Sequence, residues 1–182
     1  MEHSENATIE EVKKEAVAYT KKDNVGERIQ LIIFKLGGEE YAMNIDQIKE
    51  VVMTPRIAKV PQTANYIRGV ANIRGNIIAI MDLEERFNLI EKTEQPLADN
   101  IANYTLVVES DEFKVGVLVK EVPNTLSVNI SDIDSSSEII RYTALDERCI
   151  KGVVKSGERM IIMIDMFELL AIDEHIKKAS NV

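Results

Sequence analysis

From Arg28 onward, the pattern of apolar and polar residues is mainly that of short β-strands. Residues 28–36 (RIQLIIFKL) form a strand-like run that Gly37-Gly38 closes with a turn signal. In the next segment, EEYAMNI, the side chains of Tyr41, Met43 and Ile45 fall on one face. The pattern predicts that residues 46–52 continue in an extended conformation.

Two later segments each predict a hairpin followed by a short helix. In YIRGVANIRGNIIAIMDL the predicted turn is Gly75-Asn76, and in IKGVVKSGERMIIMI it is Ser156-Gly157-Glu158. Asp82-Leu-Glu-Glu85 and Asp165-Met-Phe-Glu168 each place an acid at a helix N-cap and Glu three residues later, the pattern of a capping box. The first helix is expected to end near Phe87-Asn88. The second, at the C-terminus, is expected to bury Phe167, Leu170 and Ile176.

These two segments also indicate an internal repeat. Ile67-Arg-Gly-Val70 returns later in the chain as Ile150-Lys-Gly-Val153, and Ile80–Leu83 returns with the same offset as Met163–Met166. A weaker echo, with a slightly smaller offset, joins GEEYAMNIDQIKEV to SDEFKVGVLVKEV. Two related halves of short strands favour two small barrels. The alternative is chance similarity between apolar strands.

The remaining segments are less regular. Residues 1–26 are predicted to be a tail that is mobile or weakly helical, and residues 91–103 a polar connecting loop. YTLVVES and EFKVGVLVKEV predict a further hairpin, Thr63–Ile67 is a candidate helical turn, and Asp134–Ser137 is expected to be a flexible loop. Ile and Val together supply 41 of the 182 residues, which favours strands.

Charge and scarce residues exclude several classes of function. The 22 basic and 31 acidic residues give a net charge of −9, which argues against binding a nucleic-acid backbone or an anionic membrane. The single cysteine, Cys149, and two histidines near the termini, His3 and His175, leave little material for a catalytic triad or a zinc site. We therefore expect no enzymatic activity, no metal and no cofactor. No apolar run is long enough to span a membrane, so a cytoplasmic protein is expected.

A few residues carry candidate chemistry. Arg74 interrupts an apolar strand pattern, so it should either pair with a carboxylate or present its planar donors at a surface. Asp82 and Asp165 are explained by helix capping and need no catalytic role. The alternation Ile48-Lys-Glu50-Val51 fits a half-exposed strand or the wall of a groove. The seven methionines either fill gaps in the core or line an adaptable binding groove.

Four blocks of the sequence, in this order, resemble the CheW family of chemotaxis coupling proteins. They are FKLGGEEYAMNIDQIKEVV, YIRGVANIRGNIIAIMDLEERF, FKVGVLVKEVPNTLSV and CIKGVVKSGERMIIMIDMFELL. The resemblance runs from about Arg28 to about Ala171, and Asn72-Ile-Arg-Gly75 is its most specific part. Ala79 departs from the family, which usually has proline there.

The resemblance implies an all-β fold with short helices, made of two five-stranded SH3-like barrels packed together and a C-terminal helix. The CheW-like domain would span residues 28–171 as two intertwined halves (about 28–96 and 97–171), between a tail at 1–27 and a helix end and tail at 172–182. The segment from Ile172 to Val182 is far too short for another domain, so we do not expect the receiver domain of the related CheV proteins.

The resemblance also implies a function. The chain would be a non-enzymatic adaptor that joins the histidine kinase CheA, through its regulatory domain, to the cytoplasmic tips of chemoreceptors in membrane-associated clusters. The receptor-binding groove would contain Ile48, Glu50, Gly69, Arg74, Gly75 and Val119, and the kinase contact would involve Ile57 and Val60. We expect Glu50 and Arg74 to pair on neighbouring strands of that groove, and Ile57, in a proline-flanked segment between Arg56 and Lys59, to be an exposed interface anchor. An adaptor of the same type in another signalling system is the main alternative. A nucleic-acid-binding barrel is disfavoured by the absence of Trp and the low aromatic content of 5%.

Overall fold

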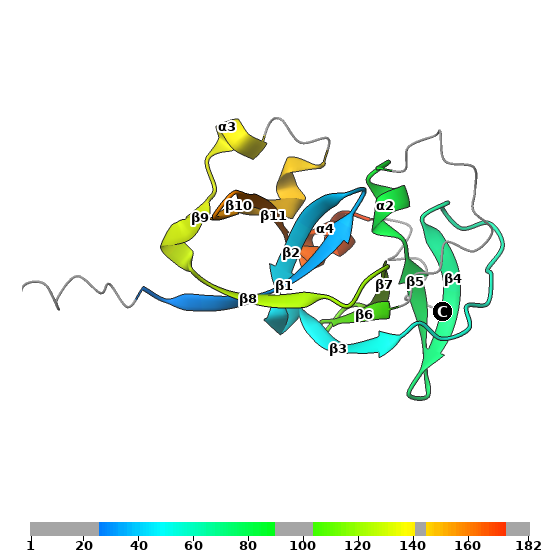
Figure 1. Ribbon diagram of the computed structural model, residues 1–182. Helices are drawn as coiled ribbons and strands as arrows, with labels where there is room; N and C mark the ends of the chain where they lie inside the picture. The colour runs from blue at the N-terminus through cyan, green and yellow to red at the C-terminus, as the bar shows by residue number, and fades with distance from the viewer. Residues whose placement is uncertain (1–25, 90–103, 141–144, 174–182) are drawn as a thin grey trace, which may run out of the picture.

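The computed structural model describes residues 26–89, 104–140 and 145–173, and these form two curled β-sheets that lie side by side (Figure 1). The first sheet has the spatial order β8 (Asn124–Asn129), β1 (Arg28–Leu36), β2 (Glu39–Asn44), β11 (Arg159–Ile164), β10 (Ile150–Ser156) and β9 (Ile133–Asp134). The second has the order β3 (Ile48–Met53), β6 (Tyr104–Glu109), β7 (Lys114–Val119), β5 (Asn76–Met81) and β4 (Ile67–Ile73). The predicted fold of SH3-like barrels with few short helices is confirmed, although one sheet has six strands.

The helical elements are short. They are the α-helices α2 (Leu83–Arg86), α3 (Ser137–Ile140) and α4 (Met166–Ile172), and the 3-10 turns η1 (Ile45–Gln47), η2 (Ile130–Asp132) and η3 (Glu147–Cys149). None of the helices in the described part of the chain is long and apolar enough to cross a membrane. The expected N-terminal helical segment, the loop at 91–103 and Ile176 lie outside the described residues.

The internal repeat is a structural repeat. The units β4–β5–α2 and β10–β11–α4 start at Ile67 and Ile150, the positions that the sequence repeat equates, and both strand pairs shift register at a glycine, Gly69 in one and Gly152 in the other. The repeat extends to the hairpins β1–β2 and β6–β7. Ala42 pairs with Met163 and Gly116 with Ile80, so Ala42 and Gly116 are equivalent positions, and the offset between these hairpins is slightly larger than the sequence echo indicated. Chance similarity is therefore excluded.

Each sheet contains strands from both expected halves of the chain. The hairpin β4–β5 joins β7 through a parallel pairing with β5, and the hairpin β10–β11 joins β2 through a parallel pairing with β11. Parallel pairing requires a crossover connection, so each repeat unit completes the sheet of the other half. The expected boundary near residues 96 and 97 therefore does not separate the two sheets.

The largest apolar core lies between the two sheets. It contains one face of β1 and β2, including Phe34, Tyr41 and Met43, and the inward faces of β6, β7, α2 and α4. The opposite faces of the strands fill a smaller core inside each barrel, as Ala42 does in the first sheet. Complete burial of a large aliphatic side chain contributes about 1.5–3 kcal/mol, so this shared core holds the sheets together.

Helix α4 buries Met166, Leu169 and Leu170 in the shared core, while Phe167 is only partly buried. The sequence therefore predicted the position of Leu170 correctly and missed Met166 and Leu169. The methionines differ in their burial. Met43, Met81 and Met166 are fully buried in the core, whereas Met53 and Met160 are exposed.

Both predicted N-caps are confirmed, with one difference from a complete capping box. Asp82 Oδ1 accepts the backbone N–H groups of Glu84 and Glu85, and Asp165 Oδ1 accepts those of Phe167 and Glu168. The N–H groups of the two cap residues donate to carbonyls in the equivalent positions Tyr66 and Cys149, at 2.8 and 2.7 Å. These two backbone N–H groups are therefore already hydrogen-bonded to adjacent backbone, so they do not need the glutamate side chain of a complete capping box.

Three local predictions are corrected. Residues 45–47 form the 3-10 turn η1, so the extended segment begins only at Ile48. Residues 63–66 contain turns and no helix, with the Ile67 N–H donating to the Ala64 carbonyl at 2.9 Å. The segment 134–137 ends β9 and begins α3, and Asp134 accepts the Ser136 N–H at 2.9 Å.

Candidate binding surfaces

The tip of the β4–β5 hairpin is a two-residue turn formed by Arg74 and Gly75. Both have positive φ angles, +51° and +85°, as the tight turns that match strand twist require. The side-chain oxygen of Asn72 accepts the Gly75 N–H at 2.9 Å and fixes the turn. The turn thus begins one residue earlier than predicted, and Arg74 projects from the hairpin tip instead of from a strand.

Arg74 forms an ion pair with Glu50 on β3, with its Nε 2.5 Å from Glu50 Oε2. Strands β3 and β4 are the two edges of the second sheet, so the pair links the hairpin tip to the opposite edge as the sheet curls. The Arg74 side chain remains 75% exposed, against 22% for Glu50. Arg74 therefore fulfils both alternatives from the sequence, because it pairs with a carboxylate and presents its remaining donors at the surface.

Two of the other predicted groove residues belong mainly to the shared core. Ile48, the first residue of β3, is partly buried and packs against that core. Val119 is 3% exposed and pairs with Tyr104. Tyr104 pairs with Met53, the last residue of β3, whereas Ile48 is the first residue of that strand. The structure thus brings Glu50, Arg74 and Gly75 together and does not bring Val119 to them.

Gly69 lies against the segment that carries the predicted kinase contact. Ala58 and Val70 exchange two backbone hydrogen bonds, of 2.8 and 2.9 Å, which pin this segment to the free edge of β4. A Cβ atom on Gly69 would lie 2.1 Å from the Ala58 carbonyl oxygen and 3.0 Å from Ile57 Cγ2. The φ angle of Gly69 is +141°, so both space and conformation favour glycine here.

Ile57 and Val60 line one groove of about 370 Å³ together with Lys59, Asn65, Ile67 and Arg68. Val60 is 39% exposed. Ile57 was expected to be an exposed anchor, but it is half-buried and packs against the core inside the second barrel. The backbone pairing at Ala58 draws the neighbouring Ile57 side chain inward, so Val60 is the more accessible apolar residue.

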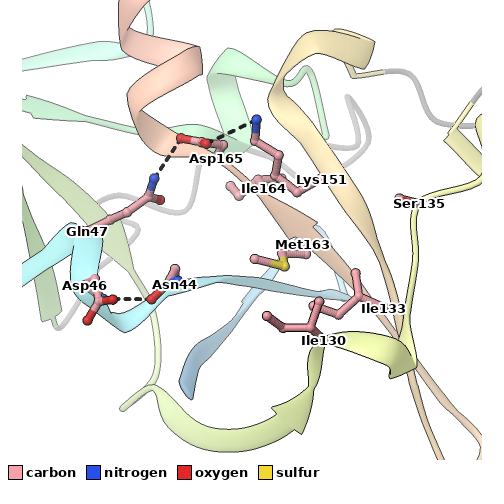
Figure 2. A pocket seen from close by; sticks show the side chains of 10 residues that line it. All are labelled: Asn44, Asp46, Gln47, Ile130, Ile133, Ser135, Lys151, Met163, Ile164 and Asp165. Atoms are coloured by element: carbon pink, nitrogen blue, oxygen red, sulfur yellow. Dashed lines mark hydrogen bonds and ion pairs between the residues drawn. The ribbon is translucent and has the colours of Figure 1, made fainter. Parts of the chain in front are cut away.

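An equivalent groove of about 420 Å³ in the first barrel was not predicted (Figure 2). One of its lining residues is Gln47, which is 8% exposed. Gln47 Nε2 donates to Asp165 Oδ1 at 2.7 Å, and Gln47 Oε1 accepts the Met166 N–H at 3.2 Å. Because η1 leads from the first sheet into β3, Gln47 attaches this connection to the start of α4. A single glutamine in a polar segment gives no sequence signal for such a role.

Asp165 also pairs with Lys151, whose Nζ lies 3.4 Å from Oδ2. Burial acts to raise the pKa of Asp165, but the hydrogen bonds from Gln47 and the Glu168 N–H and the charge of Lys151 hold it below its usual value. Asp165 therefore stays ionised at neutral pH and can accept all of these hydrogen bonds.

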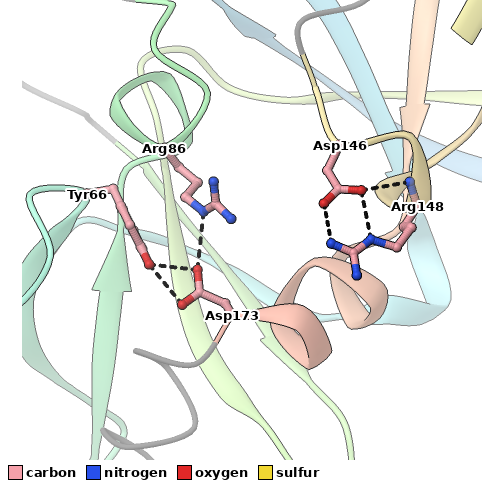
Figure 3. Close-up of polar contacts among 5 residues, drawn as sticks. All are labelled: Tyr66, Arg86, Asp146, Arg148 and Asp173. Carbon is pink, nitrogen blue, oxygen red and sulfur yellow. Dashed lines mark hydrogen bonds and ion pairs between the residues drawn. The ribbon is translucent and has the colours of Figure 1, made fainter. Parts of the chain in front are cut away.

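A second polar cluster fixes the end of α4 (Figure 3). Asp173 is 3% exposed, and both of its carboxylate oxygens lie 2.8 Å from the Tyr66 hydroxyl. Arg86 Nε donates to Asp173 at 3.2 Å, and its guanidinium lies 5.2 Å from the centre of the Tyr66 ring. Burial, followed by the hydrogen bond to Asp173, raises the pKa of Tyr66. The cluster joins α4 to α2 and the start of β4.

Nearby, Arg148 and Asp146 form a local pair beside η3, with Arg148 Nη2 2.7 Å from Asp146 Oδ2 (Figure 3). Hydrogen bonds from Arg148 lower the pKa of Asp146 to about 2. The neighbouring Cys149 is buried, and this burial raises the pKa of its thiol to about 11. The thiol is therefore protonated at neutral pH and is a poor nucleophile.

No cluster of three or more His, Cys, Asp or Glu residues suited to a metal ion occurs among the residues that the structure describes. The second barrel carries two candidate binding surfaces. One is the Glu50–Arg74 pair with Gly75 at the hairpin tip, which we call the hairpin-tip surface. The other is the groove around Ile57 and Val60, which we call the cationic groove because Lys59 and Arg68 line it.

Comparison with known proteins agrees with this architecture. The chemotaxis protein CheW of Treponema pallidum is 28% identical over 156 residues, covering 86% of this chain and 89% of that protein. The chemotaxis protein CheW of Helicobacter pylori is 31% identical over 163 residues, covering 90% and 94%. The crystal structure of the scaffolding protein TtCheW from Thermoanaerobacter tengcongensis matches 79% of this chain and 88% of its own, with a TM-score of 0.65 and 26% identity. Residues 30–174 match the CheW-like domain, and the chain therefore belongs to the CheW-like family.

Proposed function

We propose that this protein is a non-enzymatic adaptor that couples the cytoplasmic tips of chemoreceptors to the histidine kinase CheA and supports receptor control of kinase activity. Family membership and the chemotaxis proteins among its relatives support this proposal. The observation that carries it is the presence of two separate surfaces on the second barrel, connected by one short stretch of chain. An adaptor requires two such surfaces so that both partners bind together.

The hairpin-tip surface is assigned to the receptor. The Glu50 carboxylate holds the Arg74 guanidinium at one nitrogen, while the largely exposed side chain can use its other donors. A receptor helix would bind to such a surface by placing its apolar side chains beside the oriented polar contact. Ile48 is then a supporting residue, which acts from the core behind the surface. Val119, which lies away from this surface, would contribute only through the shared core.

The cationic groove is assigned to the regulatory domain of CheA, with Val60 as the accessible apolar contact and Ile57 at its base. Gly69 supports this groove because it allows the chain at Ala58 to approach β4 closely. The connection between the surfaces is direct, since β3 leads into residues 54–60 and β4 leads to Arg74. Recruitment by receptors would place this cytoplasmic protein at membrane-associated clusters.

The test is a co-capture experiment with CheA and a chemoreceptor cytoplasmic fragment from the same cell. The full chain should bind each partner alone. It should also bring CheA to an immobilised receptor fragment, which CheA alone should bind much less well. If the chain binds neither partner, or if each partner displaces the other, the adaptor assignment is rejected. Capture of receptors from a different signalling pathway, with no binding to CheA, would replace it by the same function in that pathway.

A further inference from the structure

The cationic groove differs from the rest of the surface in its charge. Most described lysines and arginines outside it pair with a carboxylate, as Arg74 does with Glu50 and Arg159 with Glu40. Lys59 and Arg68 line the groove, and neither forms an ion pair with a residue that the structure describes. Arg56, next to Ile57, is also without such a pair. In a chain of net charge −9, this groove is therefore lined by two cations without a described carboxylate partner, and a third such cation is adjacent to it in the sequence.

The internal repeat supplies a direct comparison. Lys151 is the counterpart of Arg68 in the second repeat unit, and it pairs with Asp165. The counterpart of Asp165 is Asp82, which lies near Arg68 but forms no ion pair with it and instead caps α2. Glu84, also near Arg68, pairs with Lys120 at 2.7 Å. The same structural position is thus neutralised within one repeat and left charged in the other.

The groove itself contains no carboxylate among its lining residues. Its apolar part consists of Ile57, Val60 and Ile67, and its polar part of Asn65 and the two cations. Lys59 and Arg68 are both exposed, so their charges act on an approaching partner without a large desolvation cost. An apolar centre with a charged rim is the usual arrangement of a protein interface.

We propose that the cationic groove receives an apolar side chain of the kinase that is flanked by carboxylates, and that Lys59 and Arg68 steer this docking. The inference rests on the proposed function, because it specifies the chemistry of the kinase surface that the groove accepts. Complementary rim charges accelerate association and make it sensitive to salt, while the apolar contact governs dissociation. The groove therefore selects its partner during the encounter, before apolar contact is complete.

The experiment measures association and dissociation rates of full-length CheA with the full chain over a series of NaCl concentrations. The test variant is Lys59→Gln with Arg68→Gln. Its matched control is Lys49→Gln with Lys155→Gln, which removes the same charge from two exposed lysines outside the groove that also form no described ion pair. A third protein carries Lys59→Glu and Arg68→Glu.

In low salt the test variant should associate about 3- to 10-fold more slowly than the wild type, and its rate should depend less on salt. The charge-reversed protein should be slower still. The control and all dissociation rates should stay near those of the wild type. If the test variant and its control behave alike while the wild type binds CheA, the inference is wrong and the proposed function stands. If the wild type does not bind CheA at any salt concentration, the proposed function fails, and the inference fails with it.

Two further measurements exclude other occupants. In sedimentation experiments without CheA, the wild type and the test variant should show the same degree of self-association at every salt concentration. Vesicles of phosphatidylglycerol and phosphatidylcholine should not retain the wild type more than the test variant. Retention or self-association that depends on Lys59 and Arg68, together with unchanged CheA kinetics, would assign the groove to a membrane or a second copy and overturn the inference.

Discussion

Arg74 and Glu50 belong to opposite edges of one sheet, yet their side chains form an ion pair because the sheet curls until its edges approach each other. The expectation from the sequence was a pair on neighbouring strands. The pair lies at the surface, and Arg74 is 75% exposed, so it contributes less than about 1 kcal/mol to stability. Its position fits a role in orienting a binding surface better than a role in holding the barrel together.

We therefore predict that Arg74→Ala weakens receptor binding and kinase activation more than it weakens CheA binding. Combining it with Glu50→Ala should cost less than the sum of the single changes, because both residues act in one network. The four proteins of the cycle are compared by receptor affinity, CheA affinity and melting temperature. Arg159→Ala is the matched control, since it removes a similar exposed pair with Glu40 from the other barrel. Equal losses for both partners that follow a fall in melting temperature would indicate a bracing role only.

The second prediction concerns the apolar part of the kinase contact. Val60→Asp should weaken CheA binding by about 1–3 kcal/mol, the range for an apolar interface residue, and leave the melting temperature nearly unchanged. Ile57→Asp should weaken binding and also lower the melting temperature, because Ile57 packs against the barrel core. The control is Val122→Asp at a residue that is 60% exposed. Normal CheA binding by the Val60 variant would remove this residue from the interface.

The third prediction separates two glycines, Gly69 and Gly75, that the family resemblance assigned to one groove. Gly69→Ala should displace Ile57 and Ala58, because its Cβ would overlap the Ala58 carbonyl, and should impair CheA binding. Gly75→Ala meets no atom within 4 Å, so its cost is conformational, about 1 kcal/mol, and falls on the hairpin tip. Binding of both partners by both variants gives the answer. If the Gly69 variant loses only receptor binding, Gly69 belongs to the receptor-binding surface and not to the kinase contact.

The fourth prediction follows from the lowered pKa of Asp165. A carboxyl whose pKa is lower in the folded state contributes stability above its unfolded pKa of 3.8, and this contribution disappears as the pH falls through the folded pKa. Asp165→Asn should lower stability at neutral pH and flatten the loss of stability below about pH 4. Urea unfolding at several pH values measures both effects. An unchanged slope in acid would show that Asp165 does not titrate with folding.

The sequence predicted the local elements and the repeat well, because both depend on short-range patterns. The N-caps at Asp82 and Asp165 and the alternation of Tyr41 and Met43 are visible in a few neighbouring residues. How the strands assemble into sheets was not predictable in the same way. The parallel pairings of β5 with β7 and of β11 with β2 depend on contacts between distant segments, and no short pattern records them.

The candidate surfaces were likewise predictable only where a short stretch of sequence carries the signal. A carboxylate partner for Arg74 was inferred from its charge within an apolar context, and the structure shows that pair. The burial of Ile57 was missed because it follows from the single backbone bridge between Ala58 and Val70. Gln47 was missed because its hydrogen bonds reach Asp165 and Met166, which lie far away along the chain.

The most direct test of the adaptor function is the rate of CheA autophosphorylation in a reconstituted mixture with receptor fragments and this chain. Kinase activity should depend on receptor only when the wild-type chain is present. Arg74→Ala and Val60→Asp should each reduce that dependence, the first by weakening the receptor contact and the second by weakening the CheA contact. The account is contradicted if the receptor controls CheA equally well without the chain, or if both variants sustain full control.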